Sequence, residues 1–226
     1  MRIIDGKEGN IALVDGDNCI CRFVEETGRL DHDTHLLNRL RNYIPKGGTV
    51  LDVGAFIGDH TKYYSDKVGE NGHVLAIEPD KDNYECLMFN LGTFRYKNVL
   101  PLNIGLGEKV SSGKSIQIDT NKGMNYVTAG DDFEILPMAA IGFKRLDFIK
   151  IDVEGMEMEV LKGGAQIIQE FKPVMLIEIN RMTLDRKGIR YSDIFDYLTS
   201  IGYKFRNIYD GIGLNGEQFD IICEPI

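Results

Sequence analysis

The stretch VLDVGAFIGDHT, residues 50–61, begins with the apolar run of a buried strand and ends with the pattern of a helix. Two glycines, Gly54 and Gly58, stand at the junction. Because glycine has no Cβ atom, such a turn lets a ligand lie against the main chain beside the N-terminus of a helix. Glycine also ends strands for purely local reasons, so the surrounding motifs have to decide what this turn does.

Short apolar runs and amphipathic segments alternate along most of the chain. The runs expected to form strands are TVLDVG, HVLAIE, NVLPLNI, LDFIKID, PVMLIEI, YKFRNIY and FDIICE. Apolar residues recur at helical spacing over 33–44, 58–68, 81–91, 156–170 and 191–200. This alternation predicts an α/β fold in one domain, with a mostly parallel central sheet and helices on both of its faces.

Two segments do not follow this alternation. Residues 11–24, IALVDGDNCICRFV, consist of two apolar runs around a turn-forming Asp-Gly-Asp-Asn and predict a β-hairpin. We therefore expect residues 1–32 to be an N-terminal hairpin extension of a domain that spans 33–226. Residues 106–140 are polar and rich in glycine, which predicts either a long functional loop or a surface hairpin.

Composition narrows the classes of partner. The chain has 35 acidic against 26 basic side chains and a formal charge of -9, which argues against a surface that binds nucleic acid. No apolar run is long enough to span a membrane. The four cysteines lack metal-site spacing. We therefore interpret them as buried free thiols in a reducing compartment. We expect a cytoplasmic location without membrane or nucleic-acid partners.

The histidines do not form a metal-binding pattern in the sequence. His32 and His35 precede or open the first predicted helix, and no third histidine follows them at ligand spacing. We therefore expect both to cap or pack, and His60 to face the rim of the binding site. No metal site is predicted.

Polar residues gather where the predicted strands end. In open α/β sheets, ligands bind outside the carboxyl ends of the strands. Four of the five groups at these ends contain an acidic residue, which a structural strand end does not require. The groups are 52–58, 78–80, 103–105, 152–155 and 178–180.

Glu78 strengthens the interpretation of the glycine turn. It ends the next strand, 26 positions after Asp52 (78 minus 52), where doubly wound folds place an acid that accepts hydrogen bonds from ribose hydroxyls. The turn is neither the G-x-G-x-x-G of dinucleotide folds nor a P-loop, and it contains no lysine. An acid ahead of the glycines suits a ligand with an amino group, a positive charge and a ribose. S-adenosylmethionine has these features.

Three segments, VLDVGAFIGDHT, LAIEPD and LDFIKIDVEGMEMEVLKGG, together resemble the FkbM-type S-adenosylmethionine-dependent methyltransferases. The resemblance extends from about residue 35 to the C-terminus, and IKIDVEG followed by E-V-L-K-G is its most specific part. It implies a Rossmann-like methyltransferase fold, the cofactor S-adenosylmethionine, and methyl transfer to hydroxyl groups of sugars, polyketides and other secondary metabolites. The expected acceptor is therefore a small-molecule or glycan hydroxyl.

The resemblance also assigns the cofactor-binding residues. Phe56 stands where many relatives have Asn, which puts in doubt any contact that this Asn makes. Asp52, Gly54, Gly58 and Thr61 are assigned to the methionine part, Glu78 to the ribose, and Ile104 and Gly105 to the adenine. Ala55, Phe56 and Pro79 are assigned to cofactor binding without a specific part.

A second acidic cluster follows the strand LDFIKID. If the chain stays extended, Asp152 and Glu154 face the same side, although both could instead favour the N-terminus of the next helix. Methyl transfer to an alcohol benefits from a general base, and a carboxylate can serve. Glu178 and Asn180 end the next strand and either position the acceptor or merely close that strand. We predict Asp152, Glu154 and Glu178 as the catalytic residues.

Several alternatives stay open. Lys114, Asn125 and Tyr126, in the segment 106–140, are candidates for contact with the acceptor. A nucleotide-dependent oxidoreductase of the same fold class is disfavoured by the missing third glycine. A non-catalytic module that binds the cofactor is disfavoured by the acids at 152 and 154. The acceptor and the oligomeric state are not encoded in any pattern of the sequence.

Overall fold

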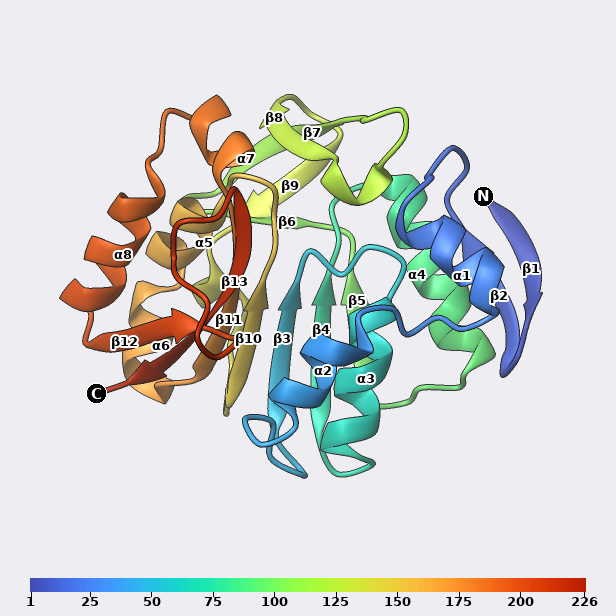
Figure 1. Cartoon of the computed structure of the whole chain (residues 1–226), viewed down its shortest axis with the longest axis horizontal. Helices are drawn as coiled ribbons and strands as arrows, with labels where there is room; N and C mark the ends of the chain where they lie inside the picture. The colour runs from blue at the N-terminus through green and yellow to red at the C-terminus, as the bar shows by residue number, and fades with distance from the viewer.

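The computed structural model describes residues 1–226, and a seven-stranded sheet forms its centre (Figure 1). In spatial order, the strands are β12 (Tyr203–Asn207), β13 (Gln218–Pro225), β11 (Val174–Asn180), β10 (Phe148–Ile151), β3 (Thr49–Val53), β4 (His73–Ile77) and β5 (Val99–Leu102). The strands from β11 to β5 are parallel, whereas β13 runs antiparallel to both of its neighbours. The predicted α/β fold with a mostly parallel sheet is confirmed.

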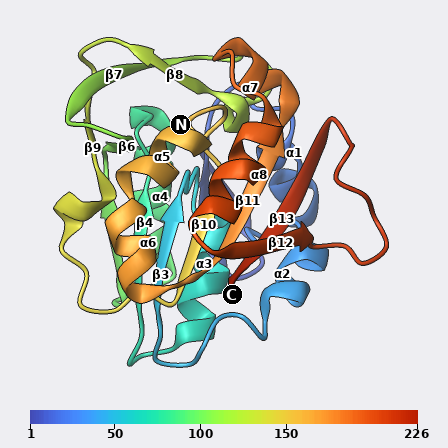
Figure 2. The same ribbon diagram turned by 90° about the vertical axis from the view of Figure 1, so that its left-hand side faces the viewer.

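Helices cover both faces of this sheet (Figures 1 and 2). One face carries α2 (Thr34–Leu40), α3 (Asp59–Val68) and α4 (Lys81–Thr93), and the other carries α5 (Glu157–Gly163), α6 (Ala165–Phe171) and α8 (Tyr191–Ser200). Strand alternation explains the two layers, because successive side chains point to opposite faces. In β3, Val50 packs with the first group of helices and Leu51 packs with the second.

The N-terminal extension begins with an antiparallel hairpin of β1 (Arg2–Gly6) and β2 (Gly9–Leu13). Asn90 of α4 joins this hairpin to the glycine turn. Its carboxamide accepts a hydrogen bond from Ala12 N–H and donates to the carbonyl oxygens of Ala12 and Ile57. The extension is therefore attached to the main domain by buried polar contacts.

The hairpin predicted over 11–24 is wrong in position. The second apolar run forms helix α1 (Ile20–Thr27) instead of a strand. Asp17 accounts for the difference, because its carboxylate accepts hydrogen bonds from the backbone N–H groups of Cys19 and Cys21 at the start of this helix. A turn rich in Asp and Asn can begin a helix as well as join two strands, since both side chains accept from backbone N–H groups.

Residues 106–140, predicted as a loop or a hairpin, belong to a second, four-stranded sheet. Its order is β6 (Gly105–Leu106), β9 (Phe133–Leu136), β7 (Ser111–Ile116) and β8 (Tyr126–Ala129), with the short 3-10 turns η1 (Lys122–Met124) and η2 (Met138–Ile141). This sheet lies beyond the carboxyl ends of the central strands, at the top of Figure 1. It is joined to the N-terminal extension, because the Asp17 carboxylate also accepts a hydrogen bond from Lys122 N–H.

The helix predicted over 156–170 is divided at Gly164 into α5 and α6. Close packing requires small residues here: a Cβ atom on Gly163 would overlap the carbonyl oxygen of Gly107, and one on Gly164 would lie 2.7 Å from Met138 Cε. A further helix, α7 (Arg181–Arg186), follows β11 without having been predicted. None of the helices combines the length and the apolar character that crossing a membrane requires.

Candidate active site

A cavity of about 570 Å³ lies at the carboxyl ends of β3, β4, β10 and β11. Its size is typical of small-molecule sites. The N-terminal extension contributes Cys19, Ile20 and His32 to its wall, and the four-stranded sheet contributes Leu106, Val127 and Ile135. Sequence analysis predicted this position, because strand ends are the usual ligand site in such sheets.

Eight of the predicted site residues line this cavity. They are Gly54, Phe56, Glu78, Pro79, Gly105, Asp152, Glu154 and Glu178. The other predicted residues lie outside its wall: Asp52, Ala55, Gly58, Thr61 and Ile104. Asn125 also lines the cavity, whereas Lys114, Tyr126 and Asn180 do not.

The two glycines of the turn are required by the protein itself. Gly54 has φ +85°, and a Cβ atom there would overlap the backbone carbonyl oxygen of Asp152. Gly58 has φ +91°, and a Cβ atom there would lie 2.8 Å from Leu87 Cδ1. Gly58→Val would therefore disturb the fold, contrary to the expectation that Gly58 only makes room for a ligand. The close approach that the sequence indicated is an approach of one chain segment to another.

Asp52 supports the turn from behind the cavity wall. Its fully buried carboxylate accepts a 2.6 Å hydrogen bond from Thr61 Oγ1, which fixes the first turn of α3. Burial raises the pKa of Asp52 to about 6, although the ammonium group of Lys150 opposes this shift. The structure thus gives Asp52 and Thr61 positions that support the glycine turn from outside the cavity wall.

Lys150 was missed by sequence analysis. It is the register partner of Asp52 on the adjacent strand β10 and is 5% exposed. Its Nζ atom lies 3.1 Å from Asp152 Oδ2 and 3.8 Å from Asp52 Oδ1, and it donates a 2.6 Å hydrogen bond to the carbonyl oxygen of Gly54. Burial alone would lower the pKa of Lys150, but the surrounding carboxylates raise it, so the ammonium stays charged. The feature of the sequence that could have indicated this role is the single lysine inside the apolar run LDFIKID.

Glu78 lies between the turn and the next helix, at 5% exposure. Its Oε2 atom accepts a 2.9 Å hydrogen bond from Phe56 N–H, and its Oε1 atom accepts from Asp80 N–H at 3.0 Å and from Asn83 Nδ2 at 3.2 Å. Burial raises the pKa of Glu78 to about 7, although these hydrogen bonds lower it. A carboxylate has about four acceptor positions, so Glu78 can still accept a hydrogen bond from a ligand hydroxyl.

The three predicted catalytic carboxylates converge. An oxygen atom from each of Asp152, Glu154 and Glu178 lies within 4.8 Å of the others. The predicted reason was wrong: β10 ends at Ile151 and Glu154 has φ +54°, so the chain is not extended between the two acids. Gly155 follows with φ +105°, and a Cβ atom there would lie 2.6 Å from the carbonyl oxygen of Thr183.

Burial and mutual repulsion set the protonation of this cluster. Burial raises the pKa of Glu154, and the neighbouring Asp152 raises it further. The pKa of Glu178 is raised for the same two reasons, and Glu154 adds to the effect. Asn180 Nδ2 donates a 3.4 Å hydrogen bond to Glu154, and Gln218 Nε2 donates a 2.9 Å hydrogen bond to Glu178.

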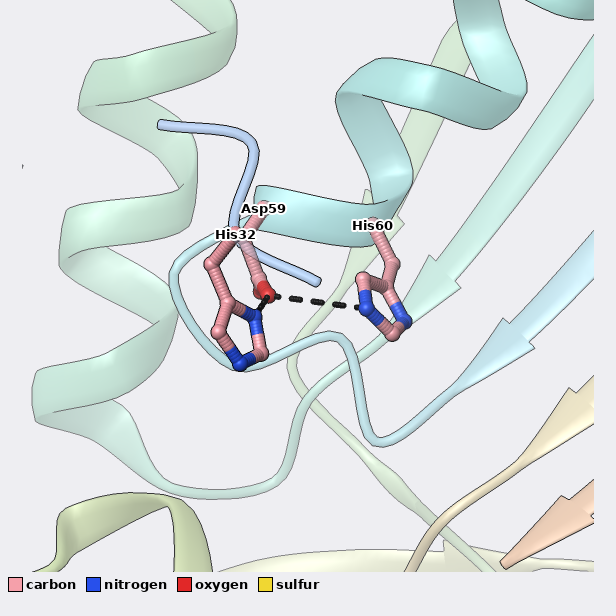
Figure 3. Close-up of side chains that lie close together, drawn as sticks. All are labelled: His32, Asp59 and His60. Carbon is pink, nitrogen blue, oxygen red and sulfur yellow. Dashed lines mark hydrogen bonds and ion pairs between the residues drawn. The ribbon is translucent and has the colours of Figure 1, made fainter. Parts of the chain in front are cut away.

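His32, which was predicted to cap or pack, and His60, which was predicted to face the rim, come together at another part of the cavity. His32, Asp59 and His60 all line it, and Figure 3 shows both imidazole rings beside the Asp59 carboxylate. His35 lies apart, with its ring centroid 6.3 Å from that of Tyr209. The prediction that His60 faces the rim agrees with this position. The proximity of His32 to His60 was not predicted, since the two are far apart in the sequence.

Comparison with known proteins identifies the family. A family model, the methyltransferase FkbM domain, matches residues 52–205. The chain belongs to the FkbM methyltransferase family. The match includes the glycine turn, Glu78 and the acidic cluster, which are the parts on which the resemblance in the sequence was based.

The chain is also similar to individual proteins, of which the two solved structures bear on the fold alone. Over 143 residues, the chain is 29% identical to the hexuronic acid methyltransferase AglP of Haloferax volcanii; the match covers 57% of this chain and 54% of AglP, so this chain spans about half the length of that relative. The solved structure of methyltransferase FkbM from Methylobacillus flagellatus has a TM-score of 0.55 at 21% identity, covering 79% of this chain and 44% of that one. A precorrin-6y C5,15-methyltransferase from Geobacter metallireducens has a TM-score of 0.53 at 16% identity, covering 99% and 97%.

The cofactor of the FkbM family is S-adenosylmethionine, and the cavity residues fit it. Glu78 offers a buried acceptor for the ribose hydroxyls at the end of β4. The acidic cluster of Asp152, Glu154 and Glu178 complements the positive charges of a sulfonium and an amino group. A carboxylate beside a cation is favoured in its charged form, so the cofactor would lower the raised pKa values of this cluster.

Proposed function

We propose that this protein transfers a methyl group from S-adenosylmethionine to a hydroxyl oxygen of a sugar, glycan or secondary-metabolite small molecule. The observation that carries this proposal is the convergence of Asp152, Glu154 and Glu178 in the cavity. Family membership supports methyl transfer, and AglP, described as a hexuronic acid methyltransferase, supports a sugar acceptor. Membership of a methyltransferase family also favours methyl transfer over hydride transfer.

Glu154 is the proposed general base. When bound, the cofactor supplies an activated methyl group, and the protein has to take the proton from the acceptor hydroxyl. Glu154 is 7% exposed and is oriented by Asn180, so its carboxylate is held in a partly dry environment. A base whose pKa is raised towards the working pH is better suited to this transfer, which typically contributes about 10²–10⁴-fold to the rate.

Asp152 and Glu178 have supporting roles in this proposal. Asp152 is held next to Glu154 by Lys150, whose Nζ atom lies 3.1 Å from Asp152 Oδ2. Glu178 is held by Gln218 on β13 and faces the same space, where it can accept a hydrogen bond from the acceptor. The proton lost by the hydroxyl passes to Glu154, and the neighbouring acids allow it to move within the cluster.

The charge of the cavity restricts the acceptor. Among the lining residues, the acidic ones are Asp33, Asp59, Glu78, Asp152, Glu154, Glu178 and Asp220, and the only lysine or arginine is Lys150. Lys150 already faces two carboxylates. An anionic acceptor would meet net repulsion, so we propose that neutral hydroxyl compounds are better acceptors than uronic acids.

The test is transfer of a labelled methyl group from S-adenosylmethionine into matched panels of neutral sugars, uronic acids and natural-product alcohols. We expect label in an alkali-stable ether product, with neutral acceptors ahead of their acidic counterparts. Glu154→Gln should lower turnover at least about 100-fold and should lower cofactor affinity by a much smaller factor, because Asp152 and Glu178 still face the cofactor's positive charges. Glu170→Gln, an exposed change on α6, serves as the control.

Three results would contradict the proposal. Cofactor binding in calorimetry without transfer to any panel would favour a non-catalytic binding module. Binding of a nicotinamide dinucleotide in place of S-adenosylmethionine would favour an oxidoreductase. Label in an alkali-labile ester or on nitrogen would retain methyl transfer but reject the hydroxyl acceptor.

A further inference from the structure

Three side chains from two separate segments meet at one place in the cavity wall (Figure 3). The Nδ1 atom of His32 lies 2.9 Å from Asp59 Oδ2, and the Nε2 atom of His60 lies 3.9 Å from the same oxygen. The centroids of the two imidazole rings are 5.9 Å apart. One donor atom from each of the three residues lies within 4.8 Å of the others.

His60 is incomplete in this arrangement. The residue is only 9% exposed, and neither of its ring nitrogens has a hydrogen-bond partner. A buried polar group without a partner destabilises the fold, because it has given up its hydrogen bonds to water. The Asp59 carboxylate lies too far away, at 3.9 Å, to satisfy it by a hydrogen bond. The position of His60 therefore points to a ligand between the three side chains.

The sequence holds this cluster in place. Gly58, in the left-handed conformation, begins α3, so Asp59 and His60 lie in its first turn. His32 belongs to the segment between α1 and α2, which is anchored by Leu30 at 2% exposure. Asp33 then caps α2 by accepting a hydrogen bond from Leu36 N–H. The three donor groups are thus fixed by helix starts and by packing before any ligand binds.

We propose that His32, Asp59 and His60 bind a divalent transition-metal ion, for which Zn²⁺ is the test ion. Two imidazoles and one carboxylate suit zinc and similar ions, whereas Mg²⁺ and Ca²⁺ prefer oxygen donors alone. Donor atoms at about 2.0–2.1 Å from a tetrahedral zinc ion are separated by about 3.3 Å. This value lies between the 2.9 Å from His32 Nδ1 to Asp59 Oδ2 and the 3.9 Å from His60 Nε2 to the same oxygen. The ion would bind one of the two unpartnered ring nitrogens of His60, whereas a simple His32–Asp59 ion pair leaves both without a partner.

The fourth coordination position would be open to the cavity. All three residues line the cavity, and three protein ligands with one open position are typical of zinc ions that bind water or a substrate oxygen. The nearby ammonium group of Lys150 would repel the ion, but it is held by Asp152, Asp52 and the Gly54 carbonyl oxygen. This site is distinct from the acidic cluster at Asp152, Glu154 and Glu178, whose donors are all oxygen.

The inference goes beyond the proposed methyl transfer and is tested without it. The full chain, stripped with a chelator, is titrated with Zn²⁺ by calorimetry and with Co²⁺ by visible absorption. We expect one Zn²⁺ per chain, Co²⁺ bands typical of four-coordinate nitrogen and oxygen ligands, and a higher melting temperature with Zn²⁺. The added stability follows because the ion would join the N-terminal extension to α3.

Variants assign the ligands. His60→Ala and His32→Ala should each weaken Zn²⁺ binding at least about 100-fold, since the loss of an outer-shell partner alone costs about 10–100-fold. His73→Ala removes an exposed histidine at the start of β4 and should leave the affinity unchanged. Glu154→Gln should also leave it unchanged. If His60→Ala does not fold, the Zn²⁺ affinity of His32→Ala tests the proposal. His32 is only half-buried, so its replacement is expected to leave the fold intact.

Three results would overturn the proposal. The first is no Zn²⁺ uptake by the stripped protein at millimolar concentration. The second is the same affinity in His32→Ala and His60→Ala as in the unchanged protein. The third is loss of binding in Glu154→Gln with retained binding in both histidine variants, which would assign the ion to the acidic cluster.

Discussion

A Cβ atom on Gly54 would overlap the main-chain carbonyl oxygen of Asp152, so the end of β3 and the end of β10 can approach one another only with glycine at this position. The positive φ of Gly54 adds a second requirement. In the sequence, Gly54 suggested a nearby ligand. In the structure, it allows the glycine turn to pack against the chain at Asp152.

Gly54→Ala is expected to lower the free energy of unfolding by about 2–5 kcal/mol, through a strained positive φ together with overpacking. The measurement is urea unfolding at equilibrium. Gly142→Ala is the matched control, because Gly142 also has a positive φ, +75°, but has no atom within 4 Å of its Cβ position. That control should cost about 1–2 kcal/mol. Equal losses in the two variants would mean that the approach to Asp152 is unimportant.

Lys150→Met is expected to destabilise the protein by about 3–5 kcal/mol, because it leaves the buried Asp52 carboxylate without its cation. The double variant with Asp52→Asn should recover part of this loss, which a double-mutant cycle measures. Lys204→Met, at an exposed position of β12, should change the stability by less than about 0.5 kcal/mol. Strictly additive effects in the cycle would show that Lys150 and Asp52 do not interact.

Glu78→Gln is expected to weaken binding of S-adenosylmethionine by about 1.5–3 kcal/mol, the scale of a hydrogen bond to a charged group. Calorimetry measures the affinity. Because Glu78 also holds the backbone N–H groups of Phe56 and Asp80, the melting temperature has to be measured on the same samples. Glu85→Gln makes the same change at an exposed position of α4 and should have no effect. Unchanged affinity in Glu78→Gln would remove the assignment of the ribose.

The melting temperature is expected to fall as the pH rises from about 5 to 7. Burial raises the pKa of Glu78 from 4.5 to about 7, that of Glu157 from 4.5 to about 7 and that of Asp52 from 3.8 to about 6. In this range the folded state binds more protons than the unfolded state, so raising the pH favours unfolding. The lowered pKa of His60 acts in the opposite direction and reduces the slope.

A thermal scan at constant ionic strength over this pH range checks the sign. Glu78→Gln imitates the protonated side chain and should flatten the slope. A melting temperature that rises steadily from pH 5 to 7 would mean that these carboxyl groups are charged in the folded protein.

The strand ends could be predicted from the sequence because a parallel sheet brings all carboxyl ends to the same edge. This geometry alone placed Glu78, Asp152, Glu154 and Glu178 around one cavity. Lys150 could not be predicted in the same way, because its role depends on β3 lying beside β10, and strand order is not contained in the local pattern. The pairing of His32 with His60 depends equally on how the N-terminal extension packs.

The turn at Asp17 illustrates a different limit. Asp-Gly-Asp-Asn is compatible with a hairpin and with the start of a helix, and in the structure Asp17 makes local contacts at the helix start together with one contact distant in the sequence. The Asp17 carboxylate accepts hydrogen bonds from Cys19, Cys21 and Lys122 N–H groups at once. At the division of 156–170 into α5 and α6, Gly163 likewise packs against the distant Gly107, where a Cβ atom would overlap the Gly107 carbonyl oxygen.

The attachment of β2 to the glycine turn through Asn90 has a consequence for recombination between relatives. Apolar residues of the extension, among them Leu13, Val24 and Leu30, share one core cluster with Phe56 and Ile57 of the turn. A chimera that exchanges only the first 32 residues would place a foreign surface against this turn. Exchange of the extension together with Phe56, Ile57 and Asn90 would keep both sides of the junction matched. We therefore expect these positions to be exchanged together between relatives, although they are separated in the chain.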